Sequence, residues 1–164
     1  MPMDILNLII VAIWFILPAY FANSFPVIFG KIFRGKFPID FNKKWNKKPI
    51  LGKGKTWPGF FGGILVGILI GFLQGRFLAG ILLSIGALAG DLVKSFAKRR
   101  AGVVSGKPWP VIDQLDFIIG ALLFVSIVEM PSLETIIIVL VLTPAFHVAA
   151  NMAAYLFKVK KVWY

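Results

Sequence analysis

Five long apolar stretches constrain this chain more than any other feature of its sequence. A membrane-spanning helix needs roughly 20 predominantly apolar residues, and stretches near this length lie at about residues 5–22, 58–75, 77–93, 114–130 and 133–157. Hydrophobic residues make up 59% of the chain, above the roughly 45–50% found in soluble domains. The sequence therefore predicts an all-α integral membrane protein with five transmembrane helices, folded as a single domain over residues 1–164.

The basic residues are distributed unevenly along the chain. Of the 18, nine lie in the first loop (residues 23–57), five in the loop at 94–113 and three in the C-terminal tail, which leaves Arg76 alone on the other side. Because loops rich in lysine and arginine stay in the cytoplasm, we expect the N-terminus outside and the C-terminus in the cytoplasm. The sequence thus predicts a multi-pass cell-membrane protein with two cytoplasmic loops and a basic tail. The first helix has no signal-peptide pattern, so we expect it to be retained.

Acidic residues gather where the third and fourth apolar stretches meet the cytoplasm. Asp91, Ser95 and Lys98 are spaced i, i+4, i+7 and share one helix face. Asp113 and Asp116 follow at the opening of the next helix. Helix capping can explain this second pair, and an ion pair with a lysine can explain Asp91. However, ionisable groups attached to membrane spans indicate a functional site by default.

A second polar segment precedes the apolar stretch at 58–75. It reads GKGKTWPG over residues 52–59 and includes Lys55 and Thr56. A helix N-terminus favours anions, so this segment is a weak signal for phosphate binding, without the Walker A spacing. Asn23, at the end of the first helix, either satisfies backbone groups near Pro18 or contacts a ligand.

Carboxylates and basic residues at one membrane edge suit phosphoryl chemistry. Carboxylate oxygens are preferred ligands of Mg²⁺, and lysine and arginine neutralise phosphate charge. At this edge a nucleotide arrives from water and a lipid phosphate arrives from the bilayer. Nucleotidyl transfer between them is therefore the favoured interpretation, and we expect no nucleic-acid partner.

Three motifs carry a resemblance to a known family. Residues 90–99, GDLVKSFAKR, resemble the G-D-x-x-x-S-x-x-K-R core of the CTP-dependent phosphatidate cytidylyltransferase family. Residues 113–116, DQLD, resemble its D-R-x-D, and residues 55–59, KTWPG, resemble its K-T-W-E-G. The short chain and its Lys-Arg-Arg run are most similar to the archaeal branch, the CDP-archaeol synthases. Gln114 and Pro58 depart from the bacterial pattern.

The resemblance implies a Mg²⁺-dependent transferase of archaeal phospholipid biosynthesis. It would move CMP from CTP to 2,3-bis-O-geranylgeranyl-sn-glycerol 1-phosphate, an isoprenoid ether lipid phosphate, and form CDP-archaeol and pyrophosphate. By position, the catalytic residues would be Asp91, Asp113, Asp116 and Lys98, with the three aspartates as metal ligands. The substrate-binding residues would be Lys55, Thr56, Ser95, Arg99 and Asn23.

Two other interpretations use the same residues. A small membrane transporter or channel for an anion predicts polar groups near the bilayer midplane, whereas the charges here lie at the cytoplasmic ends of the spans. A CDP-alcohol phosphotransferase would need a long aspartate motif that is missing. Glycine recurs at every fourth position from 59 to 75, which is compatible with internal helix packing or with a homodimer.

Overall fold

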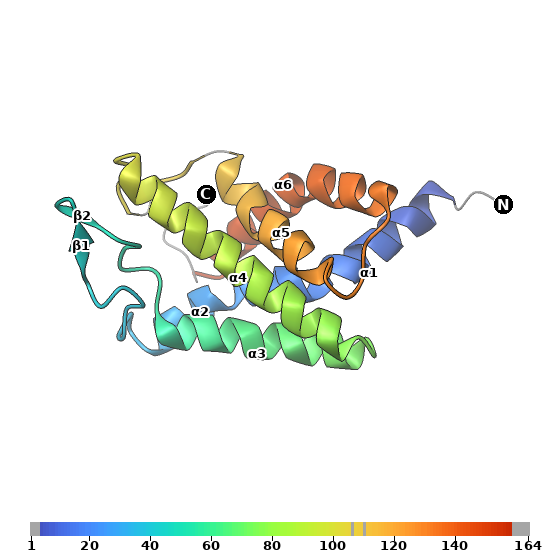
Figure 1. The fold of residues 1–164 in the computed structure, drawn as a ribbon, viewed down its shortest axis with the longest axis horizontal. Helices are drawn as coiled ribbons and strands as arrows, with labels where there is room; N and C mark the ends of the chain where they lie inside the picture. The colour runs from blue at the N-terminus through green and yellow to red at the C-terminus, as the bar shows by residue number, and fades with distance from the viewer. Residues whose placement is uncertain (1–3, 106, 110, 159–164) are drawn as a thin grey trace.

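The computed structural model describes residues 4–105, 107–109 and 111–158 as a bundle of helices with one small hairpin (Figure 1). The longer helices are α1 (Ile5–Ser24), α3 (Trp57–Leu73), α4 (Phe77–Arg100), α5 (Ile112–Val125) and α6 (Leu133–Leu156). Between α1 and α3 lie the short helix α2 (Pro26–Ile32) and the antiparallel strands β1 (Lys44–Trp45) and β2 (Lys48–Pro49). The predicted helical architecture is confirmed.

Three segments of the described residues are long and apolar enough to cross a membrane: Ile5–Ile32, Phe77–Arg100 and Leu133–Leu156. Helix α3 is apolar but has 17 residues, and α5 has 14. At a rise of about 1.5 Å per residue, both are shorter than a hydrocarbon core of roughly 30 Å. Five crossings and their direction therefore remain predictions. Two basic residues of the predicted tail, Lys160 and Lys161, lie outside the described residues.

The structure corrects the boundaries of two predicted helices. Helix α4 does not end at Val93 but continues to Arg100, because basic side chains in a last turn are favourable at a helix C-terminus. The loop that was predicted at 94–113 is therefore shorter and covers residues 101–111. Helix α5 covers 112–125 instead of 114–130. Its end is marked by Ser126, whose hydroxyl turns back and donates to the carbonyl oxygen of Leu123 at 2.8 Å.

The hydrophobic core joins four of the helices. Its largest fully buried side chains include Ile16 of α1, Leu83 of α4, Ile118 of α5 and Val139 of α6. This packing brings the C-terminal end of α4 and the N-terminal end of α5 to the end of the molecule that carries the hairpin (Figure 1). The core therefore positions the charged residues of both helices side by side.

The glycine pattern of α3 serves packing within this chain. A Cβ atom on Gly71 would overlap Gly80 of α4, and one on Gly67 would lie 2.8 Å from the carbonyl oxygen of Pro18 in α1. Small residues allow helix backbones to approach this closely. A homodimer remains a prediction.

Candidate active site

The ammonium group of Lys94 lies where three carboxylates meet. Its Nζ is 3.1 Å from Asp91 Oδ1, 3.3 Å from Asp113 Oδ1 and 3.1 Å from Asp116 Oδ2. Asp91 and Lys94 come from α4, and the other two aspartates come from the first two turns of α5. We call the three aspartates the carboxylate cluster. The structure thus brings together the aspartates singled out in the sequence and adds Lys94, whose only signal was its i, i+3 spacing from Asp91.

Two further lysines complete the ion pairs of the carboxylate cluster. Lys55, just before α3, pairs with Asp91 Oδ2. Lys98 Nζ lies 2.9 and 2.8 Å from the two carboxylate oxygens of Asp113 and donates to the carbonyl oxygen of Lys107 at 2.7 Å. Three lysines therefore balance three aspartates, which satisfies the requirement that buried charges be paired.

Asp116 has the least compensated carboxylate of the three. Its side chain is 6% exposed, and neither oxygen forms a hydrogen bond within the described part of the chain. The Lys94 ammonium approaches Oδ2 at ion-pair distance without hydrogen-bond geometry. A buried charge with so few partners is costly, so this carboxylate is ready to accept a cation or a donor from a ligand.

The carboxylate cluster fits a magnesium ion in the kind of ligand it offers. Mg²⁺ prefers carboxylate oxygens at about 2.0–2.1 Å, whereas the present oxygens surround an ammonium nitrogen at 3.1–3.3 Å. Accordingly, no group of three or more histidine, cysteine or acidic side chains within residues 4–105, 107–109 and 111–158 is close enough to hold one metal ion as it stands. The cluster would have to contract by about 1 Å for all three oxygens to reach Mg²⁺.

A cavity of about 460 Å³ lies between the first loop and the C-terminal end of α4. This volume is within the range of roughly 300–1,000 Å³ typical of small-molecule sites. Its lining includes four basic side chains and one acidic one: Lys44, Lys48, Lys53, Arg99 and Asp40. Arg99 is 6% exposed, and its Nε has no hydrogen-bond partner among the described residues. A buried guanidinium with an unsatisfied Nε in a cavity lined by basic side chains suits a phosphate group.

Two predicted substrate-binding residues, Ser95 and Thr56, form hydrogen bonds with backbone groups of the chain itself. Ser95 Oγ donates to the backbone oxygen of Asp91 at 2.7 Å. Thr56 Oγ1 accepts from the backbone N–H of Gly59 at 3.3 Å and caps α3. Asn23 lies in the last turn of α1, and among the described residues no hydrogen bond or ion pair links it to the carboxylate cluster. Their roles in substrate binding remain predictions.

Asp40 organises the loop that walls the cavity. Its Oδ1 accepts from the backbone N–H of Asn42 at 3.0 Å, and its Oδ2 accepts from those of Leu51 at 2.9 Å and Gly52 at 3.0 Å. Burial raises the pKa of Asp40, but these hydrogen bonds outweigh burial and hold the pKa below its usual value. No pattern in the sequence marked this residue.

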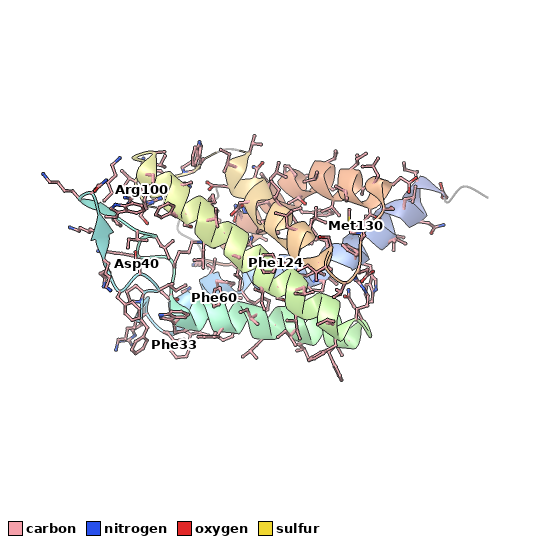
Figure 2. All side chains as sticks on the ribbon, in the orientation of Figure 1. Phe33, Asp40, Phe60, Arg100, Phe124 and Met130 are labelled. Atoms are coloured by element: carbon pink, nitrogen blue, oxygen red, sulfur yellow. The ribbon has the colours of Figure 1, made fainter. Side chains whose placement is uncertain are left out.

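Arg100 ties the hairpin to the end of α4. Its guanidinium donates to the carbonyl oxygens of Trp45 at 2.7 Å, Lys48 at 3.2 Å and Pro49 at 2.6 Å. In return, Lys48 Nζ donates to the carbonyl oxygen of Arg100 at 3.0 Å. Figure 2 shows Asp40 and Arg100 at this end of the molecule. The cavity wall is therefore anchored on the helix that carries Asp91.

Comparison with known families identifies the family to which this chain belongs. The model of the CDP-archaeol synthase (CarS-like) family matches residues 5–79 and 75–164. This chain belongs to the CDP-archaeol synthase family. It is therefore an enzyme, a nucleotidyltransferase, and the sequence-based assignment to the archaeal branch is confirmed.

Individual relatives support membership over nearly the whole chain. The CDP-archaeol synthase of Pyrococcus horikoshii is 45% identical over 96% of this chain and 98% of its own length. The CDP-archaeol synthase of Methanococcus aeolicus is 41% identical over 99% of this chain and 100% of its own length. A solved structure, described as an intramembrane enzyme for archaeal membrane lipids biosynthesis, matches with a TM-score of 0.75 and 34% identity, over 87% of this chain and 94% of that one. The chain is thus a membrane-embedded transferase of archaeal lipid synthesis.

Proposed function

We propose that this member of the CDP-archaeol synthase family transfers CMP from CTP to 2,3-bis-O-geranylgeranyl-sn-glycerol 1-phosphate in a Mg²⁺-dependent reaction. A phosphate oxygen of the lipid attacks the α-phosphorus of CTP, and the bond from that phosphorus to the bridging oxygen breaks. Pyrophosphate leaves, and the new phosphoanhydride bond forms CDP-archaeol. The observation that carries this proposal is the carboxylate cluster, whose helix α4 also contributes Arg99 to a cavity lined by four basic side chains.

The side chains divide into two groups by charge. In the cavity, Arg99 and Lys53 bind the triphosphate, because a buried guanidinium and an exposed ammonium complement its oxygens. At the cluster, Lys55 and Lys98 hold phosphate groups in line for displacement. The three aspartates would hold Mg²⁺, which when bound would neutralise charge on the reacting phosphates. A phosphate monoester dianion is itself the nucleophile, so no side chain has to act as a general base.

We also propose that α1, α3, α4, α5 and α6 all cross the membrane, with the carboxylate cluster at the cytoplasmic side. The support for this arrangement is that basic residues are concentrated at one end of the molecule and not at the other. The hairpin end carries the basic loop, whereas at the other end Arg76 pairs with Glu129 at 2.7 Å. A cytoplasmic site would meet CTP from solution and the lipid phosphate from the bilayer.

A reconstitution assay tests the reaction. The purified chain is incubated with labelled CTP, Mg²⁺ and either the geranylgeranylated or a diacyl glycerol phosphate, and the lipid fraction is analysed for a CDP-lipid. Product with the ether lipid alone supports the proposal in full, and product with both removes the claim of lipid specificity. No product from folded protein, beside a working control enzyme, would overturn it.

A further inference from the structure

Lys94 occupies the point at which a divalent cation would have to bind. Its Nζ is within 3.3 Å of an oxygen from each of the three aspartates. Its side chain is 13% exposed, so the ammonium is held among the carboxylates and not in solvent. Lys55 and Lys98 each pair with one aspartate, at the edge of the cluster, whereas Lys94 alone contacts all three.

The charge of the cluster is already balanced without a metal. Three carboxylates face the ammonium groups of Lys55, Lys94 and Lys98. A free divalent ion would bring two more positive charges to within a few ångströms of an ammonium group, and that repulsion is strong where few side-chain atoms reach water. An ion that arrives on a nucleotide triphosphate brings a net negative charge instead. The site should therefore favour the metal–nucleotide complex over the bare ion.

We propose that Lys94 is a positioning residue that substitutes for the divalent metal in the nucleotide-free enzyme, and that it withdraws when the metal–nucleotide complex binds. This inference rests on the proposed function. The spacing of the cluster agrees with it, because the oxygens lie at ammonium distance and not at magnesium distance. A lysine suits this exchange, since its flexible stem lets the ammonium move to phosphate oxygens without leaving the site.

Metal binding without turnover tests the proposal. Mn²⁺ is titrated into the detergent-purified full-length chain without nucleotide, and bound Mn²⁺ is measured by electron paramagnetic resonance. We expect Lys94→Met and Lys94→Gln to bind Mn²⁺ at least about tenfold tighter than wild type, because the competing charge is gone. The exposed Lys36→Met serves as the matched control and should bind like wild type. Adding Asp116→Asn to Lys94→Met should remove the gain.

Wild-type protein should bind Mn²⁺ more tightly when CTP is added in the absence of lipid. Folded Lys94 variants that bind Mn²⁺ no tighter than wild type would overturn the proposal. Variants that unfold without metal but fold in Mn²⁺ would support it, whereas variants that unfold under both conditions would make Lys94 a permanent structural counter-ion and also overturn it. Formation of CDP-lipid by wild type is measured separately, so a failure of this inference is distinguishable from a failure of the proposed reaction.

Discussion

Gly90 of α4 lies directly against the backbone of Asp116 in α5. A Cβ atom at Gly90 would be 3.0 Å from the carbonyl carbon of Asp116 and 3.3 Å from Cα of Phe117, and it would overlap the Asp116 oxygen. The next residue in α4 is Asp91, so the same close approach sets the distance between two members of the carboxylate cluster. The contact between α4 and α5 at Gly90 therefore determines both the packing of these helices and the geometry of the carboxylate cluster.

Gly90→Ala should damage both stability and activity. The added methyl group pushes α4 and α5 apart, at a cost of about 1–3 kcal/mol, and shifts Asp91 relative to Asp116. Thermal unfolding in detergent and the rate of CDP-lipid formation measure the two effects. Gly30→Ala in α2 is the matched control, because a Cβ there meets nothing within 4 Å. If Gly90→Ala and Gly30→Ala had the same melting temperature and the same activity, this account of the packing would be contradicted.

Conversion of any aspartate of the carboxylate cluster to asparagine should abolish turnover while leaving the protein folded. Asn keeps the shape of the side chain but loses the charge that a metal requires, so we expect kcat to fall by at least about 100-fold. Steady-state rates and circular dichroism are the measurements. Glu129→Gln, at the other end of the molecule, removes an exposed ion pair and should retain activity. A fully active Asp116→Asn enzyme would refute the metal assignment.

Arg99→Met should weaken the binding of CTP more than it slows the chemical step. The guanidinium lies in the 460 Å³ cavity with an unsatisfied Nε, and loss of a charge-assisted contact with phosphate should raise KM for CTP about tenfold. Initial rates at saturating lipid separate KM from kcat. Lys36→Met, in the first loop, controls for the loss of one positive charge outside the cavity. An unchanged KM would remove Arg99 from the nucleotide site.

Asp40→Asn should destabilise the cavity wall in a pH-dependent manner. Because the folded-state pKa of Asp40 is lowered, its contribution is fully present above the unfolded pKa of about 3.9. That contribution decreases as the pH falls below this value and is lost once the pH passes the folded pKa. Melting temperatures at pH 7, 5 and 3 should show a difference between wild type and variant that is constant at pH 7 and 5 and smaller at pH 3. The exposed Asp4→Asn should show little difference at any pH.

Single introduced cysteines can establish the orientation, since the chain has no cysteine of its own. Figure 2 shows Phe33, three residues before Lys36, near the hairpin end of the molecule and Met130 in the half away from the hairpin. In intact cells, a membrane-impermeant maleimide should label Met130→Cys and should label Lys36→Cys only after the membrane is opened. The reverse pattern would place the carboxylate cluster outside the cytoplasm.

The apolar stretches predicted the helices well because burial in lipid demands both apolar side chains and internal hydrogen bonding. The largest error falls where charge, and not hydropathy, decides the structure. In addition to the favourable basic last turn, ion pairs of Lys94 and Lys98 with carboxylates of α5 stabilise the seven residues of α4 beyond Val93. Such partners are distant in sequence, so a window of neighbouring residues cannot reveal them.

The grouping of the three aspartates could be predicted, because an acidic residue attached to a membrane span is costly and therefore stands out in the sequence. Lys94 could not be assigned a role in the same way. In sequence it is one of several basic residues, and its central position depends on α5 packing against α4. Asp40 depends equally on contacts with a segment eleven and twelve residues later.

The 14 residues of α5 span only about 21 Å. If Val125 reaches the far boundary of a hydrocarbon layer roughly 30 Å thick, the opposite end of α5 stops well below the near surface. Asp113 and Asp116 would then lie about 9 Å below the near boundary of that layer, at the depth of the acyl chains, under a locally thinned or wetted patch of the leaflet. A lipid could present its phosphate to them by moving sideways within the leaflet, with its chains still in the membrane.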